Sequence, residues 1–130
     1  MKIIRIVLFL IAILVYDSAY SCPIPENIWS KIITRKVITS WYGREFHGQK
    51  MANGEKFNMH EISAAHKKLP FGKQVFFENL ENGRSLIVTI KDRGPYILGR
   101  DFDLSYAAAK KLGFIKKGLA QLRASYMAED

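Results

Sequence analysis

Side chains able to do acid–base chemistry gather in one glycine-rich loop and at the ends of predicted strands. They carry carboxyl, imidazole, amide or guanidinium groups and are Glu45, His47, Asn53, Glu55, His66, Asp92, Arg93, Arg100, Asp101 and Asp103. The histidines are spread out, and no His-x-x-x-His or Cys-x-x-Cys spacing occurs, so the sequence predicts no metal site. Neither the Gly-x-Ser-x-Gly turn of serine hydrolases nor a phosphate-binding glycine loop is present. Proton transfer by carboxyl and imidazole groups remains, and it suits cleavage of a glycosidic bond.

Asp92 is the carboxyl best placed for such work. The strand expected just before it, 84–91, has apolar side chains at every second position, so one of its faces should be buried. The strand stops at Asp92, where Arg93-Gly94-Pro95 begins a turn. A carboxyl partly withdrawn from water at such a boundary can hold its proton near neutrality and act as a general acid. A structural pair with Arg93 is the alternative.

The strands that must position these groups are predicted from β-branched and alternating segments. Four are visible in the pattern, at 37–42, 74–80, 84–91 and 119–126. Asn82-Gly83 lies between two of them and favours a hairpin, because both residues tolerate positive φ. The segment 43–58 between the first strand and the next element is a long polar loop, and long loops in compact domains are often functional.

Two short helices are expected, at 62–69 and 105–112. Ser63 would cap the first and Pro70 would stop it. Asp103 or Ser105 would cap the second, and Gly113 would end it. Strands with few helices, and no regular strand–helix alternation, indicate a small β-rich barrel rather than a parallel sheet.

Residues 1–21 have the features of a secretory signal peptide. Lys2 and Arg5 precede an apolar run, and Ala19-Tyr20-Ser21 offers small residues at the two positions that signal peptidase reads. A retained membrane span is the alternative. However, the stretch 3–15, even with Arg5 counted in, has 13 residues, whereas a spanning helix needs about 20. Cleavage after Ser21 is therefore expected.

Cys22, the single cysteine, would then be the first mature residue, the position at which bacterial lipoproteins are acylated. It is a candidate for lipidation. Ordinary cleavage with a thiol left in place is the alternative, because Ala19 stands where a lipoprotein signal usually has Leu. Residues 22–36 are expected to form a lead-in segment, and 37–127 a single domain, since 109 mature residues (130 − 21) suit one hydrophobic core.

The basic charge suggests a polyanionic partner. The formal charge of +8 becomes +7 when Lys2, Arg5 and Asp17 leave with the signal peptide (+8 − 2 + 1). Nucleic acid is one candidate, but export favours anionic envelope polymers and membrane surfaces. Charge that serves solubility alone is the alternative, because the lysine pairs are scattered along the chain.

Several short motifs follow one another along the chain. The first group is Ser40-Trp41-Tyr42-Gly43, Phe46-His47-Gly48 and Ala52-Asn53-Gly54-Glu55-Lys56-Phe57. The second is Ala64-Ala65-His66, Leu69-Pro70-Phe71-Gly72, Asn79-Leu80, Asn82-Gly83-Arg84 and Asp92-Arg93-Gly94-Pro95. The third is Asp103-Leu104-Ser105, Ala108-Ala109 and Leu112-Gly113. In this order the motifs resemble the rare lipoprotein A family of septal-ring lytic transglycosylases, and the resemblance runs from about Ile38 to Tyr126. It implies a mainly-β fold, a six-stranded double-psi β-barrel with two short helices, related to a domain of expansins.

The resemblance also implies an activity and its residues. Family members are endolytic peptidoglycan lytic transglycosylases, which cleave MurNAc–GlcNAc glycosidic bonds and leave 1,6-anhydro-MurNAc ends. The family's proposed catalytic residues correspond here to Asp92, His66 and Glu55. No metal or other cofactor is implied. The expected location is the periplasm or cell envelope, with a possible outer-membrane anchor through Cys22, and the expected state is a monomer.

Four further residues are candidates for substrate binding. Trp41 and Tyr42 could stack on sugar rings or belong to the core, and Asn53 and Arg93 could hydrogen-bond the glycan. Met51 departs from the family pattern, which commonly has a threonine before Ala-Asn-Gly-Glu. Met51 therefore leaves open a non-catalytic, expansin-like peptidoglycan-binding module. A basic protein that binds anionic polymer or a divisome partner is a third possibility.

Overall fold

The computed structural model describes residues 25–129, and the chain divides into two units, residues 1–31 and 32–130. The first unit contributes one described element, the four-residue helix α2 (Glu26–Trp29), which follows Pro25. The predicted signal peptide, 1–21, and Cys22 lie outside the described residues. Within the described range, no helix has the length and apolar character needed to cross a membrane.

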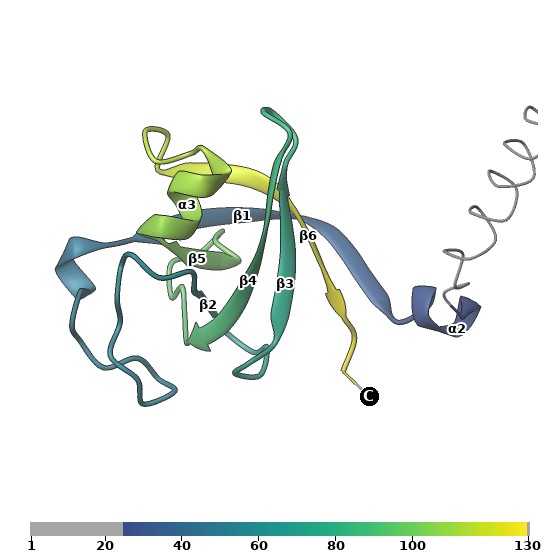
Figure 1. Ribbon diagram of the computed structural model, residues 1–130, viewed down its shortest axis with the longest axis horizontal. Coiled ribbons are helices and arrows are strands. Elements are labelled where there is room, and N and C mark those ends of the chain that lie inside the picture. Colours follow the sequence, from purple (N-terminus) through teal and green to yellow (C-terminus); the bar gives the residue numbers. More distant parts are fainter. Residues whose placement is uncertain (1–24, 130) are drawn as a thin grey trace, which may run out of the picture. The chain divides into compact units, whose positions relative to one another are not determined.

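The second unit is a closed barrel of six strands (Figure 1). The strands are β1 (Ile32–Tyr42), β2 (Ala64–His66), β3 (Gln74–Asn79), β4 (Arg84–Asp92), β5 (Phe102–Ser105) and β6 (Leu119–Met127). Around the barrel their order is β1-β5-β2-β4-β3-β6, with parallel pairing of β1 with β5 and of β2 with β4. A 3-10 turn, η1 (Arg44–Phe46), follows β1, and helix α3 (Tyr106–Leu112) follows β5. The predicted mainly-β, six-stranded barrel is confirmed.

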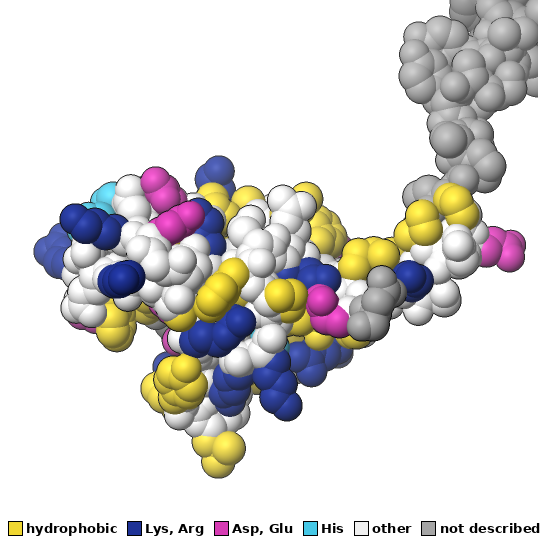
Figure 2. All heavy atoms as spheres, turned by 90° about the horizontal axis from the view of Figure 1, so that it is seen from below, with side chains coloured by type: hydrophobic (Ala, Val, Ile, Leu, Met, Phe, Trp, Pro, Cys, Tyr) yellow, Lys and Arg dark blue, Asp and Glu magenta, His cyan; other side chains and the backbone are white. Residues whose placement is uncertain are grey.

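Basic side chains are spread over the surface. Figure 2 shows Lys and Arg side chains in several separate groups on one face, among hydrophobic side chains and fewer acidic ones. This agrees with the scattered lysine pairs of the sequence. Any specific recognition of an anion must therefore come from a local arrangement of these charges.

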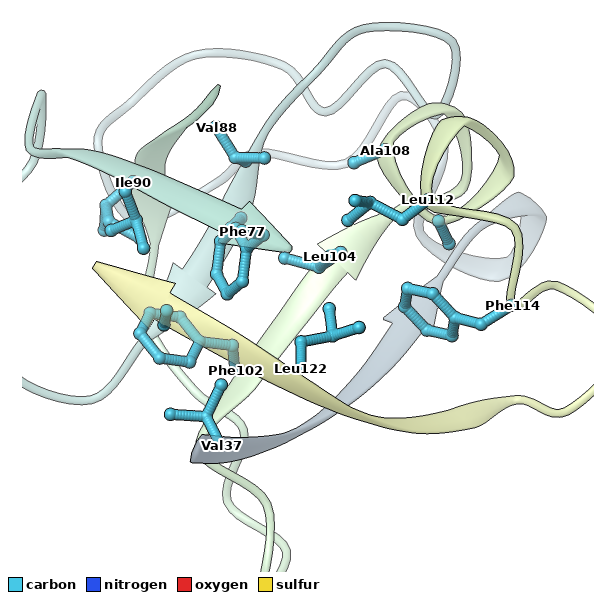
Figure 3. Packing of buried hydrophobic residues seen from close by; sticks show 14 of the residues in the cluster. Val37, Phe77, Val88, Ile90, Phe102, Leu104, Ala108, Leu112, Phe114 and Leu122 are labelled. Carbon is cyan, nitrogen blue, oxygen red and sulfur yellow. The ribbon is translucent and has the colours of Figure 1, made fainter. Parts of the chain in front are cut away.

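The barrel interior is filled by alternate residues of the strands (Figure 3). Val88 and Ile90 of β4 are fully buried, whereas Ile87 between them is 57% exposed, as the period-two pattern predicts. Phe77 of β3 and Phe102 of β5 meet edge to face with ring centroids 5.1 Å apart. Helix α3 closes this core with buried apolar side chains, which are Ala108, Ala109 and Leu112.

The helix predicted at 105–112 is confirmed as α3, together with the residues predicted to begin and end it. The Ser105 hydroxyl accepts a hydrogen bond from the Ala108 amide at 3.3 Å, so Ser105 rather than Asp103 caps the helix. Gly113 follows the last turn with φ of 78°, the left-handed conformation that ends many helices.

The helix predicted at 62–69 is wrong. Ala64 pairs with Ile90 of β4 and with Leu104 of β5, so this segment is the short strand β2 between two other strands. The gain from two strand pairings outweighs the local helix signals of Ser63 and Pro70, which act only within the segment.

The first strand is longer than predicted. β1 begins at Ile32, five residues before Val37, and pairs with β6 from Ile32 opposite Met127 onward. Residues 32–36, expected in the lead-in, are therefore part of β1 and of the barrel sheet. The β3–β4 hairpin is confirmed, although Gly83 alone (φ 72°) adopts positive φ in its turn.

Candidate functional site

Two carboxyl groups flank one alanine at the edge of the barrel. Ala65 of β2 pairs with Asp92 at the end of β4 and with Asp103 of β5. Side chains of paired residues on adjacent strands project to the same face of a sheet. Asp92, Asp103 and Ala65 accordingly line one groove of about 290 Å³. Its other walls are Tyr42, Phe46, Arg93, Gly94, Pro95, Tyr96 and Ile97.

Backbone amides hold the Asp92 carboxyl in place. Its Oδ1 accepts hydrogen bonds from the Ala52 amide at 2.9 Å and from the Arg93 amide at 2.8 Å. These amides belong to the long loop and to the turn after β4, so both segments are fastened to Asp92. Its Oδ2 has no hydrogen-bond partner among residues 25–129 and remains available to a ligand.

Tyr42 lies beside both carboxyls as a neutral phenol. Burial raises the pKa of Tyr42 above its ordinary range, and the charges of Asp92 and Asp103 raise it further, against a small opposing effect of the Ser63 hydroxyl. The Tyr42 hydroxyl is buried and makes no hydrogen bond of normal geometry to the described residues. Its ring stacks on Phe57 at 4.4 Å. Because the hydroxyl is sealed from solvent beside two carboxylates, its free donor can serve one of these carboxyls rather than a ligand in the groove.

Asp103 is held by a different partner. The Ser40 hydroxyl of β1 donates a hydrogen bond to its Oδ1. Because Ser40 and Asp103 are opposite each other in the β1–β5 pairing, this bond fixes the carboxyl within the sheet. The two carboxyls of the groove are thus oriented separately, Asp92 by amides and Asp103 by a hydroxyl.

Glu55 lies at the edge of this region and does not line the groove. Its carboxylate pairs with the Lys91 ammonium at 3.1 Å, and this hydrogen bond is the main cause that lowers the pKa of Glu55. The side chain is 59% exposed. Lys91 immediately precedes Asp92, so the pair ties the loop to the end of β4 near the groove.

His66 faces away from the groove. Its Nδ1 accepts hydrogen bonds from the Lys68 and Leu69 amides at 3.0 and 2.9 Å, and its ring lies 4.5 Å from that of Phe102. Burial lowers the pKa of His66 to about 4; Arg35 adds to this effect and Asp101 opposes it. The imidazole is therefore neutral near pH 7. Of the three predicted catalytic residues, the structure places only Asp92 in the groove.

The candidates for substrate binding are also separated. Tyr42 lines the groove, whereas Trp41 points to the other face of β1, where its indole N–H donates to the Ile115 carbonyl at 3.2 Å. Asn53 accepts a hydrogen bond from the Glu55 amide at 3.0 Å and stabilises the loop.

Arg93 lines the groove, but one end of its guanidinium is already engaged. Its Nη1 donates to the carbonyls of His66 and Leu69, at 3.3 and 2.8 Å. The guanidinium also lies 3.9 Å from the centre of the Phe71 ring. These contacts join the turn after β4 to the turn after β2, so Arg93 supports the wall of the groove.

Sequence reasoning missed several groove residues. The sequence includes Asp103 among the acid–base side chains but favours a helix cap for it, and it gives no signal for the aromatic wall residues Phe46 and Tyr96. Tyr96 is 81% exposed, which is unusual for a large aromatic side chain. The alternation of Phe102, Asp103 and Leu104 was the available signal, because it places Asp103 on the face opposite the buried pair.

The polar groups that line the groove are carboxyl, phenol and guanidinium groups. Across residues 25–129, no cluster of three or more His, Cys, Asp or Glu side chains is arranged to hold a metal ion. Two carboxyls that are oriented separately in an open groove suit proton transfer and charge stabilisation at a sugar.

Comparison with protein families gives a match over most of the chain. The family model described as “Lytic transglycolase” matches residues 34–124. The Aquifex aeolicus protein named “Probable endolytic peptidoglycan transglycosylase RlpA” is 56% identical over 88 residues, covering 68% of this chain and 39% of that protein. “Endolytic peptidoglycan transglycosylase RlpA” from Vibrio cholerae is 46% identical over 100 residues, covering 77% and 38%. The chain therefore spans about two fifths of the length of these relatives.

Solved structures show the same architecture. The Streptomyces papain inhibitor has a TM-score of 0.59 and 20% identity, covering 75% of this chain and 96% of that chain. The expansin of Clavibacter michiganensis has a TM-score of 0.57 and 16% identity, covering 75% and 52%. At such low identity the likeness concerns the fold, and it confirms the double-psi β-barrel.

Proposed function

Since the chain belongs to the lytic transglycolase family of double-psi β-barrel proteins, we propose that it is an endolytic peptidoglycan lytic transglycosylase. It cleaves the MurNAc–GlcNAc bond of glycan strands and leaves 1,6-anhydro-MurNAc ends. The observation that carries this proposal is the pair Asp92 and Asp103 in one open groove with aromatic walls. The names of the Aquifex and Vibrio relatives support the substrate and the reaction.

Asp92 acts first as acid and then as base. Its protonated carboxyl gives a proton to the glycosidic oxygen while the bond from that oxygen to C1 of MurNAc breaks. The 6-hydroxyl of the same MurNAc then forms a bond to C1 and returns its proton to Asp92. Protons balance, and no water is consumed. One carboxyl can do both steps in turn, and the unpartnered Oδ2 of Asp92 is the atom available for them.

Asp103 stabilises the charge that develops between these steps. Bond breaking gives the sugar ring oxocarbenium character, and a fixed carboxylate close to it lowers the barrier. Asp103 lines the same groove and is oriented by Ser40, so it needs no rearrangement to act. The neutral Tyr42 hydroxyl is buried beside both carboxyls and can donate to one of them during the reaction.

Glu55 and His66 act by positioning. The ion pair of Glu55 with Lys91 fastens the loop whose Ala52 amide orients Asp92. His66 holds the turn after β2 through its Nδ1, and the same turn accepts the hydrogen bonds of Arg93. Both residues thus shape the groove from outside it.

The non-catalytic alternative depended on Met51. This side chain is 6% exposed and packs in a small cluster with Tyr42, Phe57 and Ala65. It does not line the groove, so its apolar character removes no substrate contact there. The enzymatic function is therefore the one that the geometry favours.

The proposed location is the cell envelope, where peptidoglycan lies. Export through the segment 1–21 and acylation of Cys22 are part of the proposal. Mass spectrometry of the mature amino terminus distinguishes a lipidated Cys22 from an unmodified thiol. A retained segment 1–21 would contradict cleavage.

Digestion of purified peptidoglycan sacculi tests the activity. We expect the purified protein to release soluble muropeptides with anhydro-MurNAc ends, identified by mass spectrometry. Products with reducing MurNAc ends would instead indicate hydrolysis. Sedimentation with sacculi without any release would show a binding module.

A further inference from the structure

A second hollow lies beside the groove, on the other side of the end of β1. It consists of two adjoining depressions of about 320 and 460 Å³, which share His60 and Tyr106 as lining residues. Trp41 and Arg44 border the first depression, and Lys110 and Lys111 of α3 border the second. We call this surface the aromatic-basic hollow. None of its residues takes part in the proposed reaction.

One wall of the hollow is a row of rings. Trp41 and Tyr106 meet edge to face with centroids 5.6 Å apart, and His60 lies 6.3 Å beyond Tyr106. Trp41 and Tyr106 are partly buried, whereas His60 is exposed. Aromatic side chains that keep an apolar body at the surface suit the apolar faces of sugar rings.

The rest of the hollow is positively charged. Arg44, Lys110 and Lys111 form no ion pair or side-chain hydrogen bond with any residue in the described range. Glu45 is the one acidic residue among those that line the hollow. Three cations without partners around an aromatic wall therefore offer a site to an anionic ligand.

The hollow and the groove share the turn η1. Arg44 and Glu45 of this turn line the hollow, while Phe46 lines the groove. Because these residues are consecutive, a glycan strand that continued from the groove over Phe46 would reach the aromatic-basic hollow. An endolytic enzyme acts within long strands, so such an extension is available in its substrate.

From this arrangement we infer that the aromatic-basic hollow is an accessory subsite for a carboxylate-bearing sugar of the same peptidoglycan strand. The inference rests on the proposed function for the identity of the strand. The rings contact the sugar, and Lys110, Lys111 and Arg44 bind its carboxylate. That carboxylate belongs either to a stem peptide or, where the peptide has been removed, to the lactyl group of MurNAc.

The test compares two matched pairs of lysines. The variant Lys110→Gln/Lys111→Gln removes two charges from the hollow, and Gln preserves helix propensity in α3. The control Lys67→Gln/Lys68→Gln removes two exposed charges that line neither depression and, like those of Lys110 and Lys111, form no ion pair among residues 25–129. Thermal unfolding checks that each variant is folded. Binding is measured by sedimentation with teichoic-acid-free sacculi, and also with soluble chitin oligosaccharides, which carry no carboxylate.

We expect the hollow variant to bind sacculi about fivefold more weakly than wild type, as two exposed charge contacts allow. Its binding of chitin oligosaccharides, which carry no carboxylate, should be unchanged. Equal loss in the control pair, equal loss on chitin oligosaccharides, or no loss on sacculi would each overturn the subsite. Because sedimentation needs no cleavage, a wild-type protein that cleaves nothing would contradict the proposed function separately.

Removal of stem peptides from the sacculi by an amidase identifies the carboxylate. If the difference between wild type and the hollow variant persists on the denuded strands, the lactyl carboxylate is the ligand. If wild-type binding falls to the level of the variant, so that the difference disappears, the stem peptide supplies the carboxylate. A difference that persists undiminished at high salt would overturn the electrostatic contact itself, because such pairs are screened.

Discussion

Asp92 and Asp103 are held on opposite sides of a single alanine, Ala65, because β2 pairs with β4 along one edge and with β5 along the other. The crossing of strands in the double-psi barrel creates this relationship between residues that are eleven positions apart in sequence (103 − 92). Asp92 receives two amide hydrogen bonds and Asp103 one hydroxyl hydrogen bond, so the two carboxyls differ in surroundings. Two such carboxyls can divide the roles of proton transfer and charge stabilisation.

Replacement of Asp103 by Asn should slow turnover about a hundredfold, the scale of losing one electrostatic contact to the transition state. Asn keeps an acceptor for the Ser40 hydroxyl, so the fold should persist. The rate of anhydro-muropeptide release from sacculi measures the effect. Asp101→Asn is the control, since Asp101 accepts the Ile38 amide and lies outside the groove. Wild-type turnover in Asp103→Asn would remove Asp103 from the mechanism.

Replacement of Tyr42 by Phe should reduce activity without loss of stability. The Tyr42 hydroxyl is buried without a hydrogen bond, and an unsatisfied buried hydroxyl stabilises nothing in the folded protein. Chemical denaturation and the sacculus assay measure the two effects. A clear drop in stability would show that the hydroxyl has a partner in the protein, and unchanged activity would show that the hydroxyl supports neither carboxyl in the reaction.

The raised pKa of Tyr42 also makes the stability of the protein depend on pH. Above pH 10, the ordinary value for tyrosine, the unfolded chain loses this proton while the folded chain keeps it. Titration of Tyr42 therefore leaves the free energy of unfolding unchanged below pH 10 and lowers it as the pH rises above 10. In Tyr42→Phe the fall should be smaller than in wild type. Equal slopes in the two proteins would contradict the burial of the phenol.

His66 should make the protein less stable in mild acid. Its pKa is lowered to about 4, so between pH 6.5 and pH 4 the unfolded chain binds a proton that the folded chain does not. The free energy of unfolding should therefore fall across this window. In His66→Asn, which keeps an acceptor for the two amides, the fall should be smaller. His60→Asn at the surface serves as the control, and an equal change in both variants would contradict the assignment.

Phe77 should be a main support of the barrel. It is fully buried, whereas Phe76 beside it in β3 is 38% exposed. Phe77→Ala should cost about 3–5 kcal/mol of stability, as a large core truncation does. Phe76→Ala should cost much less. Urea unfolding measures both, and similar costs for the two would contradict the register of β3.

Local signals in the sequence are enough to predict the elements whose structure is determined by their own residues. Helix α3 follows from Ser105 and Gly113, and the β3–β4 hairpin follows from Asn82-Gly83. Asp92 could be placed at a strand end because the apolar alternation of β4 stops there. The pattern of apolar and β-branched residues predicts four of the six strands. The six-stranded barrel is predicted from the resemblance to the family, which rests on the order of the motifs.

Elements that depend on distant partners could not be predicted in this way. β2 has three residues and β5 has four, and each is a strand because of pairings on both of its edges. For the same reason the sequence can place Asp103 on the outer face of its strand but not beside Asp92, since that position depends on the pairing of both residues with Ala65. The ring of His66 lies against Phe102 instead of Asp92, because alternation in β2 puts His66 and Ala65 on opposite faces.

The most direct test of the central claim is the release of anhydro-muropeptides from sacculi by the variant Asp92→Asn. The amide keeps an oxygen that can accept the hydrogen bonds of Ala52 and Arg93, so the domain should remain folded and should still sediment with sacculi. Without an ionisable group at this position, proton transfer to and from the sugar stops, and release should fall to background. Release at the wild-type rate by a folded Asp92→Asn protein would contradict the account.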